Sequence, residues 1–139
     1  MLNVRDLYVA NFHRANLSRA DLGLCYLGDA NFKEANLRAT TLVEAILEGA
    51  NLSNADLHKA RLIEAKLTHA DLSGADLSGA DLRGADLSYI VFDKETKFVG
   101  ADLRNATFED YEQRQAILGL VGSEIEDPLS QANLGEDDE

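Results

Sequence analysis

An apolar residue recurs at every fifth position over most of the chain, and this spacing excludes both regular secondary structures. Leu or Phe stands at each centre from Leu7 to Phe92, and after one extra residue the series resumes at Phe98, Leu103 and Phe108. On an α-helix a step of five residues turns about 140°, so the leucines would share no face. On a continuous strand an odd period sends successive side chains to opposite sides. The pattern therefore predicts a chain that turns a corner inside every repeat.

The residues around each centre predict which side chains point inward. Ala stands two residues before the centre in 16 of 21 repeats, and the exceptions are Arg5, Cys25, Thr40, Ile90 and Thr96. We expect this residue and the centre to point inward, and the residue between them to point outward. Two residues after the centre, a type II turn needs a residue that tolerates positive φ. Glycines at this position are Gly49, Gly74, Gly79, Gly84 and Gly100. Where Glu34, Glu44 or Glu64 stands there instead, we expect type I-like turns.

Repeats such as residues 75–79 (ADLSG) and 80–84 (ADLRG) resemble the A(D/N)LXX signature of the pentapeptide-repeat family. The resemblance covers residues 2–110, and a tandem run of this length is highly specific. It implies an all-β solenoid, a right-handed quadrilateral β-helix of about five coils with four repeats per coil and a 20-residue period. Coils stacked at about 4.8 Å would form a rod on the order of 25 Å long.

A period of 20 residues predicts which side chains lie above one another. Phe12 should stack on Phe32 inside the coil. On the outside, Asn11, Asn31 and Asn51 should form an amide ladder. Asp81 should meet Arg61, and Asp86 should meet Lys66.

The C-terminal part of the sequence departs from the repeat. Residues 109–122 predict a short helix in which Tyr111, Ile117, Leu118 and Val121 fall near one face. We expect this helix to cover the last coil as a lid, with a dimer contact through the same face as the alternative. Residues 123–139 predict a mobile acidic tail that serves solubility, or attachment to a basic partner. The N-terminal end has no predicted lid, so the first coil is expected to fray or to stack on another copy.

One extra residue between Asp93 and Lys97 predicts a bulged corner. We interpret it as a structural relaxation of the repeat. A protrusion that contacts a partner is the alternative.

Charge is unevenly distributed along the chain, whose formal net charge is −12. Residues 1–70 carry eight basic and eight acidic residues, residues 71–110 four and nine, and residues 111–139 one and eight. Direct nucleic-acid binding is not expected, because no basic stripe exists to displace phosphate counterions. With no apolar run long enough for a membrane, no leader and the single Cys25, we expect a cytoplasmic protein.

The residue pattern predicts no enzyme, metal or cofactor. The outward carboxylates of successive repeats lie on different sides, whereas acid–base catalysis needs two that converge on one bond. His13, His58 and His69 stand at corners of different sides, so no metal site of two or three ligands follows. Cys25 replaces an inward Ala and is expected to be a buried small residue.

We therefore expect a non-enzymatic scaffold that presents flat sides to an unidentified protein, as a monomer or as a homodimer through one end. The candidate interaction surface consists of Asp71, Asp76, Asp81, Asp86 and Asp102. One alternative, implied by the resemblance, is a DNA mimic that binds a type II topoisomerase such as gyrase. Another is a filament joined through the open N-terminal coil.

Overall fold

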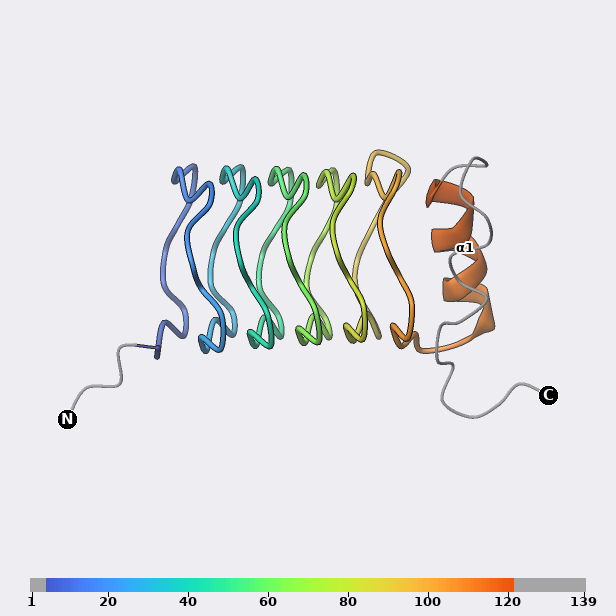
Figure 1. Cartoon of the computed structure of the whole chain (residues 1–139), viewed down its shortest axis with the longest axis horizontal. Helices are drawn as coiled ribbons and strands as arrows, with labels where there is room; N and C mark the ends of the chain where they lie inside the picture. Colours follow the sequence, from blue (N-terminus) through green and yellow to red (C-terminus); the bar gives the residue numbers. More distant parts are fainter. Residues whose placement is uncertain (1–4, 122–139) are drawn as a thin grey trace.

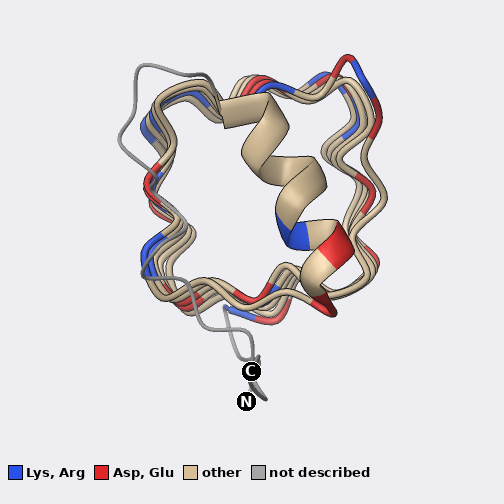
Figure 2. Ribbon diagram, turned by 90° about the vertical axis from the view of Figure 1, so that its right-hand side faces the viewer, with Lys and Arg blue, Asp and Glu red and all other residues tan. Residues whose placement is uncertain are grey.

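The computed structural model describes residues 5–121, and these form one stack of square coils (Figure 1). Parallel bridges join residues 20 apart, and the first four of them cover one lap. They are Asp6–Tyr26, Asn11–Asn31, Asn16–Asn36 and Asp21–Thr41. Viewed along the stack, the backbone is four-sided (Figure 2). We number the sides one to four by these bridges, and we number each corner by the side that it follows.

Hydrogen bonds between the coils replace those of an ordinary sheet. Asp56 donates its N–H to the carbonyl of Ala35 in the coil before (3.0 Å), and Leu57 donates to the carbonyl of Asp76 in the coil after (2.7 Å). Each side contributes only one bridged residue before the chain turns, so the bridges stay isolated and no extended strand forms among the described residues. The expected all-β solenoid is therefore built from single β-bridges.

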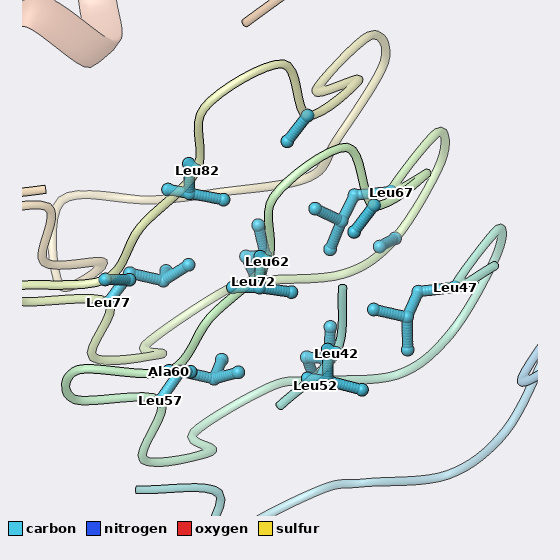
Figure 3. Close-up of a cluster of buried hydrophobic side chains, with 14 of the residues drawn as sticks. Leu42, Leu47, Leu52, Leu57, Ala60, Leu62, Leu67, Leu72, Leu77 and Leu82 are labelled. Atoms are coloured by element: carbon cyan, nitrogen blue, oxygen red, sulfur yellow. The ribbon is translucent and has the colours of Figure 1, made fainter. Parts of the chain in front are cut away.

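The core is a column of Leu and Ala side chains. Buried leucines from several sides point into the middle of the coils (Figure 3). Phe12 and Phe32 stack as predicted, with ring centroids 5.0 Å apart. Leu7 and Phe12 in the first described coil are only partly buried, whereas inward side chains of the following coils are almost fully buried. A coil is thus sealed only when it has a neighbour on both sides.

The corners share one turn geometry whether or not they contain glycine, apart from the bulged corner between Asp93 and Lys97. At the first corner, Ala10 donates its N–H to the carbonyl of Leu7 (3.0 Å), and Val9 between them has a φ of 56°. Glu34, Glu44 and Glu64 have φ values of 61°, 58° and 58°. The prediction of type I-like turns at these three positions is therefore wrong.

Bonding between coils explains why non-glycine residues accept this backbone. Glu44 donates its N–H to the carbonyl of Ile63 in the next coil (2.9 Å), and Glu64 donates to Arg83 (2.8 Å). A left-handed residue costs roughly 1–2 kcal/mol, whereas a corner of another type would lose this backbone bond to the next coil. The ladder therefore overrides the local preference of the residue.

Two threonines replace inward alanines and use their hydroxyl groups inside the coil. Thr40 donates Oγ1–H to the carbonyl of Leu17 (2.8 Å), and Thr96 donates to the carbonyl of Leu72 (2.9 Å). Thr96 follows the extra residue, after which the bridge spacing becomes 21 residues, as in Asp76–Lys97. The inserted residue is thus taken up by the second corner, which projects from the rod (Figure 2).

Helix α1 (Tyr111–Val121) lies across the last coil (Figure 1). Asp110 accepts the N–H of Gln113 (2.9 Å) and caps the helix, while Gln113 Nε2 donates to the carbonyl of Leu87 (2.9 Å).

Ile117 and Val121 are fully buried. Of the other two residues predicted on this face, Leu118 is half-buried and Tyr111 is 61% exposed. Tyr111 does not share the buried face of the helix, which is formed by Gln113, Ile117 and Val121. The predicted acidic tail, residues 123–139, lies outside the described residues.

The left-handed corners predict that one substitution has opposite effects at two positions. Ala39 is at a corner with a φ of 55°, whereas Ala55 is buried inside the coil. Ala39→Gly should raise the free energy of unfolding by about 1 kcal/mol, because it relieves the left-handed strain. Ala55→Gly should lower it by about 1–2 kcal/mol through the lost buried methyl group and the more flexible backbone. Urea denaturation of both variants measures these changes, and a destabilised Ala39→Gly protein would contradict this view of the corners.

Candidate protein-interaction surface

The five predicted aspartates do not form one patch. Asp86 lies on side one, Asp71 on side two and Asp76 on side three, while Asp81 and Asp102 stack on side four. Only this last pair shares a side. The acidic candidate surface is therefore distributed around the rod.

The carboxylates of these residues have a structural task that the sequence analysis missed. Asp71 Oδ1 accepts the N–H of Ser73 (3.0 Å), and Asp76 Oδ1 accepts that of Ser78 (2.9 Å). Asn51 does the same for Ser53 (3.0 Å). This is an Asx turn, in which Asp or Asn holds the backbone two residues ahead. The recurrence of Asp and Asn at the outward position is the sequence signal for this turn. Both side chains can accept the bond, which explains why both residue types are common there.

On side four, arginines neutralise the two stacked aspartates. Arg83 binds Asp81 through Nε (2.8 Å) and Nη2 (2.6 Å), and Arg104 binds Asp102 in the same way (2.9 and 2.6 Å). Arg83 Nε also lies 3.8 Å from Asp102. The guanidinium groups hold the pKa of both carboxyl groups below the usual range. Asp81 bridges Arg61 in the neighbouring coil, as predicted, but its carboxylate binds Arg83 of its own corner instead of Arg61.

Asp86 is likewise satisfied by groups other than its predicted partner, Lys66. Its carboxylate accepts hydrogen bonds from Ser88 N–H (3.0 Å), Thr107 Oγ1 (3.1 Å) and Thr68 Oγ1 (3.3 Å). Burial would raise the pKa of Asp86, but these hydrogen bonds outweigh it and keep the pKa low. Asp86 therefore ties three coils together and is a poor candidate for partner contact.

A groove along side one has the features of a binding surface. It encloses about 460 Å³ and is lined by Leu24, Tyr26, Glu44, Ile46, Glu64, Lys66 and Gly84. Leu24 and Tyr26 are 45% and 49% exposed. Neither Glu44 nor Glu64 forms an ion pair with another described residue. We call this the side-one groove; it combines exposed apolar groups with unpaired carboxylates.

The remaining candidate groups do not assemble into a reactive site. Cys25 is buried, as predicted, and burial raises the pKa of its thiol. His69 stacks on Tyr89 with ring centroids 5.2 Å apart. Within residues 5–121, no cluster of three His, Cys, Asp or Glu side chains could hold a metal ion. No helix in this range could span a membrane.

Comparison with known proteins finds pentapeptide repeats by sequence and pentapeptide repeat proteins by structure. A sequence profile described as pentapeptide repeats (8 copies) matches residues 10–49, 30–68 and 50–88. A pentapeptide repeat protein from the Arabidopsis thaliana thylakoid lumen is 30% identical over 85% of this chain and 79% of its own, with a TM-score of 0.57. HetL, a pentapeptide repeat protein involved in heterocyst differentiation regulation from the cyanobacterium Nostoc sp. strain PCC 7120, is 35% identical over 74% and 56%, with a TM-score of 0.48. QnrB1, a plasmid-mediated fluoroquinolone resistance protein, is 23% identical over 71% and 60%, with a TM-score of 0.49. No curated protein gives a significant match.

The bonded carboxylate of Asp86 predicts a specific pH dependence of stability. Because its pKa is lowered in the folded state, its contribution is fully present above the unfolded pKa of about 3.9 and is lost as the pH falls through the folded value. Wild-type stability should therefore fall below about pH 4. Asp86→Asn cannot titrate, so it should be less stable at pH 7 and lose less on acidification. Urea midpoints between pH 7 and 2.5 test this; parallel curves for the two proteins would refute it.

Proposed function

Because the chain belongs to the pentapeptide-repeat family, we propose that it is a non-catalytic scaffold whose side-one groove binds a segment of a partner protein. The observation that carries this proposal is the meeting of exposed apolar side chains and unpaired carboxylates in that groove. We also infer the right-handed winding that the family resemblance implies.

The rigidity of the surrounding backbone supports a docking role. Leu47 donates its N–H to the carbonyl of Lys66 (2.7 Å), and Ile46 donates to Cys25 (3.0 Å), so the groove floor is bonded on both sides. A surface that is already ordered loses little conformational entropy when a partner binds. The groove therefore favours binding without rearrangement of the scaffold.

The lining residues define the partner segment that fits. Leu24, Tyr26 and Ile46 would accept an apolar side chain near the N-terminal end of the groove. Glu44 and Glu64 follow each other at the corner beside it and would attract a Lys or Arg. Successive coils lie about 4.8 Å apart, so the two partner residues would stand two or three positions apart in an extended segment. We propose such an apolar and basic segment as the occupant.

DNA mimicry has weaker support from the charges. A mimic needs a continuous row of free anionic groups, but Arg83 and Arg104 pair with the stacked aspartates of side four. Their bidentate geometry is the stronger form of such a bond. A protein ligand of mixed apolar and basic character therefore remains the better proposal.

Selection from a random 12-residue peptide library on the intact protein tests the proposal. Recovered peptides should carry a Lys or Arg two or three residues from an apolar side chain. The double variant Leu24→Ser and Tyr26→Ser should lose binding, and Glu44→Gln with Glu64→Gln should weaken it about three- to tenfold, as expected for exposed charge pairs.

Val99→Ser provides a matched control, because Val99 is an exposed apolar residue at the third corner, away from the groove. Its affinity for the selected peptides should equal that of the wild type. If the selected peptides lack a basic residue, or if they still bind the variant with Leu24→Ser and Tyr26→Ser, the side-one groove is not the binding site.

A further inference from the structure

A second hollow lies along the third corner, and side four separates it from the side-one groove. It encloses about 350 Å³ and is lined by Ser18, Arg19, Asn36, Arg38, Ala39, His58 and Lys59. We call it the third-corner hollow. It shares no residue with the side-one groove and contains no large apolar side chain, so it suits a different ligand.

The sequence explains why the hollow forms at this corner. Arg19, Ala39 and Lys59 follow one another at 20-residue spacing, and all three have positive φ, between 55° and 63°. Their side chains therefore occupy equivalent positions in successive coils. The short Ala39 side chain between two long cationic ones leaves an open space whose walls are basic.

The charges of the hollow are mostly available. Arg38 donates one bond through Nη1 to Asp56 (3.0 Å), while its side chain stays 51% exposed. Among residues 5–121, neither Arg19 nor Lys59 forms an ion pair. Three cations thus face one carboxylate, in a protein whose net charge is −12. Such a site selects an anionic ligand.

We propose that the third-corner hollow binds an acidic peptide segment, and that its occupant is the chain's own residues 122–139. This segment has seven acidic and no basic residues. A tethered ligand also acts at high effective concentration, typically millimolar for a short linker. An acidic segment of another protein would have to displace it.

The geometry of α1 directs the segment to this corner. The chain enters α1 at the first corner, through Glu109 and Asp110, and the helix crosses the end of the rod diagonally (Figure 2). In a square, the corner diagonal to the first is the third. Val121, the last residue of α1, therefore lies near the rod edge that carries the hollow.

The distances select one part of the segment. Ala39, Lys59, Gly79 and Gly100 mark the third corner, so the hollow lies three coils from the last one, about 14 Å. Packing of α1 on that coil adds about 10 Å. Asp127 is six residues beyond Val121 and reaches about 20 Å at full extension, whereas Glu136 reaches about 50 Å. At full extension Asp127 reaches no farther than Lys59, the cation two coils from the last corner, whereas residues 136–139 can reach every cation of the hollow.

The spacing of these carboxylates also fits. Arg19 and Lys59 are two coils apart, about 10 Å. Glu136 and Glu139 are three residues apart, which is also about 10 Å in an extended chain. The spacing of these two carboxylates thus matches that of the two cations, and Asp137 and Asp138 stand between them in the sequence as the Arg38 coil stands between those of Arg19 and Lys59.

Zero-length cross-linking of the full-length protein tests this proposal. A carbodiimide activates a carboxylate, which the Lys59 amine then attacks to form an amide as the carbodiimide leaves as a urea. Mass spectrometry of the digested monomer should find Lys59 joined to residues 136–139 at least fivefold more often than Lys94, which is exposed at the second corner. Arg19→Gln should lower the Lys59 yield at least threefold. Arg61→Gln, an equal loss of charge on side four, should leave it unchanged.

Mixing isotope-labelled and unlabelled protein separates links within one chain from links between chains. Links that are mainly between chains would overturn the assignment to the chain's own segment. Equal yields at Lys59 and Lys94, or an equal effect of the two arginine variants, would show nonspecific attraction and would overturn the site itself.

Discussion

The ladder of backbone hydrogen bonds between successive coils is the constraint on which the rest of the structure depends. Each bridged residue bonds to the coil before it and its neighbour bonds to the coil after it, as with Asp56 and Leu57. This requires an equivalent turn at almost every corner, so even Glu44 adopts the left-handed backbone. It also places inward side chains in register, and a column of leucines fills the interior. Local preferences yield because a corner of another type would lose its backbone bond to the next coil.

The sequence predicted those features that the repeat imposes and missed those in which neighbouring groups compete. The inward Ala and Leu positions, the Phe12–Phe32 stack and the burial of Cys25 follow directly from the period. The number of sides came from the family resemblance, because periodicity alone does not set it. Asp81 stacks on Arg61 as predicted, but its charge partner is Arg83, because this corner arginine forms a bidentate bond. Tyr111 was not placed correctly because the polar Gln113, and not an apolar residue, completes the buried face with Ile117 and Val121.

Because the frame is so regular, differences between its surfaces arise from a few substitutions at outward and corner positions. On side one, Leu24, Tyr26 and Glu44 give a groove that is apolar and acidic. At the third corner, Ala39 between two basic residues gives a hollow of the opposite charge. The aspartates first considered for partner contact hold corners together instead. We thus expect ligands to bind where surface residues depart from the repeat consensus. The residues that keep to the consensus stabilise the fold.

The central claim is that the ladder between coils makes the middle of the rod a single rigid unit, and native-state hydrogen exchange tests it most directly. The amides of Asn51, Leu52 and Asp56 bond to neighbouring coils and should exchange only through global unfolding, with equal free energies. The amides of Leu7 and Phe12 at the open end should exchange by local fraying with lower free energies. If the middle amides exchange as readily as those at the end, or with widely different free energies, the coils are not held as one body and this account is contradicted.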